Sequence, residues 1–141
     1  MGTQEDYNAL IRERDRTRSQ YRSCESRIES CEYELRRLRP VKENISALKS
    51  RFKALRKDEK RLASGKTASW KGDTRQAFLR GLEDAGWEAD YYYKNTLDYA
   101  LDAVNDRITA LENQVMNEYG LLGRLGSALN YIGSKIENFF N

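Results

Sequence analysis

The fold of this chain is decided near its middle, where residues 63–74 read ASGKTASWKGDT. Small and polar side chains fill this stretch, and the flexible backbone of Gly65 is suited to ending a helix. Gly72, two residues after Trp70, supplies the conformational freedom that the chain needs to enter a new helix. We therefore predict a turn at about residues 63–73, with a long helical segment on either side of it.

Before the turn, a seam of residues recurs at steps of three and four, which is typical of a helix that packs along another helix. The seam comprises Tyr7, Leu10, Arg14, Thr17, Tyr21, Cys24, Ile28, Cys31, Leu35 and Leu38, then Val41, Ile45, Leu48, Phe52, Leu55, Glu59 and Leu62. Its phase shifts at the only proline of the chain, Pro40. Proline lacks the backbone N–H and crowds the preceding turn, so we expect a kink or a short break there in a first helix of about residues 6–62.

After the turn, a second apolar face starts at Phe78 and continues through Leu82, Ala85, Ala89, Thr96 and Ala100. The tail keeps helical spacing but is punctuated by glycines, which weaken a helix unless packing holds it: Gly120, Gly123, Gly126 and Gly133. No stretch alternates apolar and polar residues with a period of two, so strands are not expected. The second helix is predicted over about residues 74–138.

Two arms of matched length predict a coiled-coil-like antiparallel helical hairpin, all-α and forming a single domain over residues 1–141. The charges favour the same pairing, because residues 1–66 carry 18 Lys and Arg against 11 Asp and Glu, whereas residues 67–141 carry 7 against 11. Exposed ion pairs contribute little stability each, so they select the register while the apolar seam holds the arms together.

The tripeptide Trp70-Lys71-Gly72, followed by Arg75-Gln76-Ala77-Phe78 one turn into the second helix, resembles the WXG (ESAT-like) superfamily. The chain is most similar to the small helical proteins associated with LXG effectors in Gram-positive type VIIb secretion systems. The resemblance implies a non-enzymatic partner protein that acts as a targeting factor or chaperone. It would bind the N-terminal helical region of an LXG-type effector, another small WXG-like protein, or both.

One feature of that family is missing: no C-terminal tyrosine is followed four residues later by Asp or Glu, since Tyr99, Tyr119 and Tyr131 precede Ala103, Gly123 and Lys135. The resemblance then implies export together with a partner that supplies the signal. Charged residues 12–16 interrupt any signal-peptide core, and no apolar run is long enough to span a membrane. We expect a protein made in the cytoplasm, without membrane contact, that is secreted with its partner through a type VII system.

A surface for that partner is predicted opposite the apolar face of the second arm. Trp87 and Tyr91 lie at about 180 and 220 degrees from Phe78 on a helical wheel, unless a phase shift at Gly86 turns both inward. Further along, several apolar residues drift about 100 degrees off this face, and the tail adds others. The predicted partner-binding residues are Trp87, Tyr91, Leu97, Leu101, Val104, Ile108, Leu122, Leu125, Phe139 and Phe140. So wide an apolar surface favours a four-helix complex with another chain, or a homodimer of the purified protein.

The residue content argues against catalysis and cofactor binding. The chain contains no histidine, and no phosphate-binding loop or nucleophile motif appears. No metal site is predicted, and Cys24 and Cys31 lie about 10 Å apart along a helix, too far to bond to each other. Basic residues alternate with acids, so nucleic acid is not an expected partner. A coiled-coil adaptor unrelated to secretion and a membrane-active protein working through residues 120–141 remain the alternatives.

Overall fold

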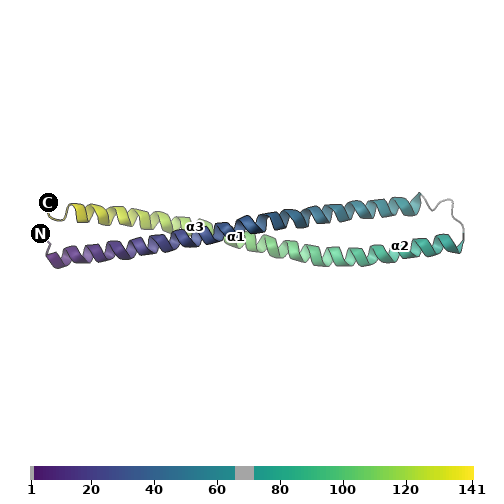
Figure 1. The fold of residues 1–141 in the computed structure, drawn as a ribbon, viewed down its shortest axis with the longest axis horizontal. Helices are drawn as coiled ribbons and strands as arrows, with labels where there is room; N and C mark the ends of the chain where they lie inside the picture. Colours follow the sequence, from purple (N-terminus) through teal and green to yellow (C-terminus); the bar gives the residue numbers. More distant parts are fainter. Residues whose placement is uncertain (1, 66–71) are drawn as a thin grey trace. The chain divides into compact units, whose positions relative to one another are not determined.

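The computed structural model describes residues 2–65 and 72–141, which are helical and include no β-strand. The elements are α1 (Gln4–Ser64), α2 (Asp73–Tyr92), the π-helical η1 (Tyr93–Leu97) and α3 (Asp98–Glu137) (Figure 1). The predicted all-α fold, with two long helical arms that pack against each other, is confirmed. The first arm is a single helix, and the second consists of three consecutive elements.

The chain divides into two compact units, and each draws on both arms. Unit 1 comprises Met1–Arg37 and Ile108–Asn141, and unit 2 comprises Leu38–Arg107. In unit 1 the start of α1 lies antiparallel to the end of α3, with both chain termini at one end of the pair (Figure 1). In unit 2 the later part of α1 lies beside α2, η1 and the start of α3. One domain over residues 1–141 stays a prediction.

α1 starts with a reciprocal pair of hydrogen bonds at its first turn. The Thr3 hydroxyl accepts a hydrogen bond from the backbone N–H of Asp6 at 3.1 Å, and the Asp6 carboxylate accepts one from the N–H of Thr3 at 3.0 Å. This capping box satisfies two N–H groups that have no partner inside the helix. The same hydrogen bonds lower the pKa of Asp6.

α1 passes through Pro40 without interruption, so the break expected there does not occur. Pro40 and Arg36, whose carbonyl loses its helical partner, both lie at exposed positions. Water can therefore satisfy that carbonyl, and the loss of one hydrogen bond does not end the helix.

The core of unit 1 follows the predicted seam. Thr17, Cys24 and Cys31, seven residues apart, are small and buried, and they alternate with larger side chains such as Ile28 and Leu35. On the facing helix, the buried residues are Ile108, Leu111 and Ile132. Alternating small and large residues let side chains from the two helices interdigitate. Cys24 and Cys31 are not bonded to each other, and both are buried.

In unit 2 the predicted seam of α1 is wrong at three of its seven positions, whereas Ile45, Phe52, Glu59 and Leu62 are partly buried. Val41, Leu48 and Leu55 are exposed, whereas Ile45, Phe52 and Arg56 are partly buried. Because α1 stays continuous at Pro40, the heptad register of unit 1 carries on unchanged, and it brings Lys49 and Arg56 to the inner face together with Ile45 and Phe52. Three apolar residues are left on the flank of the helix.

The second arm contains a π-helical turn, η1, that the sequence analysis did not predict. A π-turn inserts one extra residue and so rotates all later residues by about 100 degrees relative to a regular α-helix. This rotation equals the drift of about 100 degrees by which the later apolar residues of the second arm leave the Phe78 face in the sequence. Leu97 is consequently buried, while its neighbour Thr96, which the expected face included, is exposed.

Candidate functional site

The most exposed large aromatic pair of α2 is formed by Trp87 and Tyr91. Their rings stack with centroids 5.9 Å apart at an interplanar angle of 11°, yet 69% of Trp87 and 63% of Tyr91 remain exposed to solvent. The two residues are one helical turn apart, so the rings form one continuous apolar surface. Unit 2 leaves that surface uncovered.

Gly86 explains why Trp87 points outward. Gly86 is buried on the inner face of α2, and a Cβ atom at this position would lie 2.8 Å from Cζ of Arg56. The missing side chain thus makes room for the Arg56 guanidinium, which donates hydrogen bonds to Glu59 at 3.0 Å and to Asp90 at 2.9 Å. The alternative that a phase shift at Gly86 turns Trp87 and Tyr91 inward is wrong.

The other predicted partner-binding residues fall into three groups. Leu97 and Ile108 are buried inside their own units, so the prediction that they bind a partner is wrong. The π-turn η1 rotates the later residues of the second arm and thereby brings both side chains to the inner face. Phe139 and Phe140 pack on Tyr7 of α1, with ring centroids 5.5 and 5.1 Å away. The remaining residues are partly buried: Leu101, Val104, Leu122 and Leu125.

An apolar stripe on α1, defined here as Val41, Leu48 and Leu55, was missed as a surface. The three exposed side chains repeat every seven residues, and that spacing places them on one flank of a helix. Their apolar character predicts a place in the seam, whereas the register of α1 gives the inner positions to neighbouring residues. The heptad spacing itself was the signal that could have identified a second stripe.

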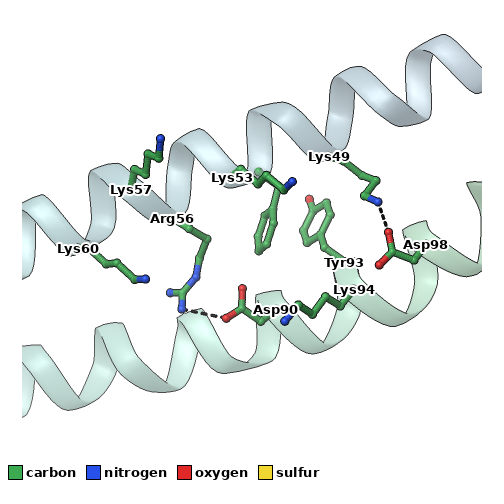
Figure 2. A pocket seen from close by; sticks show the side chains of 10 residues that line it. Lys49, Lys53, Arg56, Lys57, Lys60, Asp90, Tyr93, Lys94 and Asp98 are labelled. Atoms are coloured by element: carbon green, nitrogen blue, oxygen red, sulfur yellow. Dashed lines mark hydrogen bonds and ion pairs between the residues drawn. The ribbon is translucent and has the colours of Figure 1, made fainter.

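The opposite flank of unit 2 is a basic pocket of about 470 Å³ between α1 and the second arm. Figure 2 shows the Tyr93 ring between the two helices, and this ring stacks on that of Phe52 at 4.0 Å with an interplanar angle of 16°. Two ion pairs bridge the helices beside the rings, Lys49 to Asp98 and Arg56 to Asp90. Four lysines complete the lining: Lys53, Lys57, Lys60 and Lys94.

Unit 1 contains a polar cluster formed by the buried Cys24, the partly buried Glu118 and the exposed Arg27. The Arg27 guanidinium donates two hydrogen bonds to the Glu118 carboxylate, at 2.9 and 3.1 Å, and the Cys24 thiol lies 3.0 Å from the same carboxylate. Burial raises the pKa of Cys24, and its hydrogen bond to Glu118 raises the pKa further. The cluster therefore keeps the thiol protonated and ties α1 to α3.

The same cluster makes unit 1 sensitive to acid. Hydrogen bonds from Arg27, then from Cys24, lower the pKa of Glu118. A lowered folded-state pKa contributes stability that is present above the unfolded value, about 4.3, and is lost as pH falls through the folded value. We expect the free energy of unfolding to decrease on acidification below about pH 4.3. Urea titrations at successive pH values measure it.

Glu118→Gln should flatten that pH dependence, while Glu25→Gln, which removes an exposed carboxylate from the same unit, should leave it as in the wild type. An equally steep acid dependence in Glu118→Gln would show that the cluster is not its source.

Of the predicted turn motif, Trp70 and Lys71 lie outside the described residues. Gly72 precedes α2 with φ 71° and ψ −146°, a backbone conformation that residues other than glycine rarely adopt. The backbone freedom predicted for Gly72 is thus used at the start of α2. The Trp-x-Gly turn as a whole stays a prediction.

Within residues 2–65 and 72–141, no group of three His, Cys, Asp or Glu side chains could hold a metal ion. None of the described helices combines the length and the apolar character needed to cross a membrane. Comparison of the chain with family models, with curated proteins and with solved structures gives no match.

Proposed function

We propose that this chain is a non-enzymatic helical partner protein of a type VII secretion pathway. Its role would be to bind the N-terminal helical region of an LXG-type effector, as targeting factor or chaperone. The secretion role rests on the resemblance of Trp70-Lys71-Gly72 and the following helix to the WXG superfamily. Partner binding rests on a separate observation, the exposed Trp87–Tyr91 pair.

Trp87 and Tyr91 carry the proposal because solvent exposure of two stacked aromatic rings is unfavourable in an isolated protein. Tryptophan and tyrosine are enriched among the residues that contribute most to protein–protein binding. The apolar stripe of Val41, Leu48 and Leu55 adds an uncovered heptad flank on the other arm of unit 2. Heptad spacing favours a helix as the occupant of such a flank, which agrees with a helical effector region as the partner.

The expected result is a stable complex between the chain and the N-terminal helical region of an LXG-type effector encoded beside its gene. Trp87→Ala with Tyr91→Ala should weaken that complex at least about 30-fold, because the loss of a single hot-spot residue already costs about 2 kcal/mol. Sedimentation of the mixed proteins measures the affinity, and circular dichroism checks that helicity is retained.

A matched control removes two side chains of similar exposure from α3, Met116 and Tyr131, which are 67% and 62% exposed. Met116→Ala with Tyr131→Ala should leave the affinity within about twofold, since exposed residues outside an interface contribute little. A chain that stays monomeric in the presence of the effector region would contradict the proposed function. Equal weakening by both double variants would contradict the assignment of Trp87 and Tyr91.

A further inference from the structure

The basic pocket of unit 2 contains more positive charge than the protein itself neutralises. Its two internal ion pairs use Lys49 and Arg56, and the remaining four lysines form no ion pair with any residue that the structure describes. We call these four residues the lysine cluster: Lys53, Lys57, Lys60 and Lys94. The lining side chains as a whole carry a net charge of +4 at pH 7. A pocket of this kind has an uncompensated positive potential that attracts an anionic ligand.

The lysine cluster lies on both sides of the pocket. Lys53, Lys57 and Lys60 belong to α1, and Lys94 comes from η1 on the facing arm. Figure 2 shows Lys60 and Lys94 extending into the space between the helices, whereas Lys57 extends from α1 away from the second arm. A ligand in this position is in reach of cations from two elements, so it is held in the groove and not on the outer face of one helix.

The spacing of the cations fits a helical ligand. Lys53, Lys57 and Lys60, the α1 members of the lysine cluster, follow one another at intervals of four and three residues. They cover about 10 Å at the 1.5 Å rise of an α-helix. A second helix with carboxylates at the same intervals presents its charges at the same rise. The centre of the pocket is apolar, since it is formed by Phe52 and Tyr93, so it accommodates an apolar side chain of that helix.

Two observations disfavour a nucleic acid in this pocket. The Phe52 and Tyr93 rings stack on each other at 4.0 Å, so one face of each ring is already covered and a base could not insert between them. The carboxylates of Asp90 and Asp98 stand among the lysines and would repel the consecutive phosphates of a strand. A helical segment with carboxylates only at one-turn intervals can place its charges beside the lysines and away from Asp90 and Asp98.

We infer that the basic pocket binds an acidic amphipathic helical segment of the partner protein, with its carboxylates on the lysine cluster and an apolar side chain over Phe52 and Tyr93. Only the source of the segment rests on the proposed function. The site itself follows from the charges and rings of unit 2. The pocket would add charge selectivity to the apolar contacts of Trp87 and Tyr91.

The test uses a synthetic 18-residue helical peptide with Glu at three positions spaced by four and three residues, to match Lys53, Lys57 and Lys60, and Leu between them. Its control peptide has Gln at the three Glu positions. Fluorescence anisotropy with the full-length chain should give at least tenfold tighter binding for the Glu peptide at low salt, and the difference should shrink as salt rises. Equal binding of both peptides would overturn the inference.

Two protein variants with the same loss of charge locate the site. Replacing the lysine cluster by Gln (Lys53→Gln, Lys57→Gln, Lys60→Gln and Lys94→Gln) should weaken binding of the Glu peptide at least tenfold. Replacing four exposed arginines of unit 1 (Arg12→Gln, Arg16→Gln, Arg18→Gln and Arg22→Gln) should change it less than twofold. Equal losses in the two variants would show non-specific attraction and overturn the site.

Two further measurements separate this inference from the proposed function and from a nucleic-acid site. Trp87→Ala with Tyr91→Ala should still bind the Glu peptide, because neither residue lines the pocket. If the lysine-cluster variant binds the effector region as tightly as the wild type does, the proposed function stands. The inference that the effector contributes an acidic segment to the basic pocket is then contradicted. A single-stranded oligonucleotide with the same charge as the Glu peptide serves as a competitor. If it displaces the labelled Glu peptide at a lower concentration than unlabelled Glu peptide does, the pocket is a nucleic-acid site and the inference is overturned.

Discussion

Leu111→Ala should lower the free energy of unfolding by about 3 kcal/mol. Leu111 is 1% exposed and is the larger of the two fully buried side chains among the described residues. Truncation of a buried leucine removes its transfer free energy and leaves a cavity, a combined cost of roughly 2–5 kcal/mol. Two helices alone surround this position, so few other side chains can move in to fill the space. Urea unfolding followed by circular dichroism measures the change.

Met116→Ala provides the matched control on the same helix. Met116 is 67% exposed, and its truncation should change stability by less than about 0.5 kcal/mol. A cost below about 1 kcal/mol for Leu111→Ala would mean that α1 and α3 do not form a packed core in unit 1.

Deletion of Asn95 should leave the protein folded, with a free energy of unfolding within about 1 kcal/mol of the wild type. Asn95 is exposed and lies in η1, where the π-turn already contains one residue more than an α-helix would. Its removal converts the turn to regular α-helix and keeps both Tyr93 and Leu97 on the inner face. Helical content by circular dichroism and urea unfolding measure the outcome.

Deletion of Asn113 is the contrasting case. Asn113 is also exposed but lies in regular α-helix, so its removal rotates the rest of α3 by about 100 degrees. Leu111 and Ile132 could then no longer both face α1, and unit 1 should lose about 4 kcal/mol or more, since a buried aliphatic side chain contributes about 1.5–3 kcal/mol. Similar stability of the two deletion variants would show that η1 does not set the phase of the second arm.

The sequence alone was sufficient to predict the helical class and the core of unit 1. The seam from Thr17 to Leu35 is regular, because small and large residues alternate at heptad spacing and no competing stripe exists on that part of α1. The helical wheel placed Trp87 and Tyr91 opposite Phe78 but left open a phase shift at Gly86, and only the exposure of both side chains in the structure decided for the outward position.

Sequence reasoning failed where two apolar stripes compete or where the helical period changes. Val41, Leu48 and Leu55 are apolar and regularly spaced, so periodicity by itself assigned them to the seam in place of Lys49 and Arg56. The packed residues of α1 in unit 1 set the heptad register of the whole helix. A pattern read from residues 41–62 alone does not show that register. The basic pocket was missed for a related reason, because alternating charges along a chain gather only when lysines from α1 and η1 meet across two helices.

The sequence by itself therefore determined the elements and one packed seam, because hydrophobic periodicity acts within single helices. The tertiary structure decided which stripe faces inward in unit 2, where the second arm takes up its extra residue, and which charges share one pocket. These features depend on the contact between arms that are far apart in the chain. The helix propensity of a residue does not depend on such contacts, whereas the burial of a side chain and its ion pairs depend on which residues of the other arm lie opposite it.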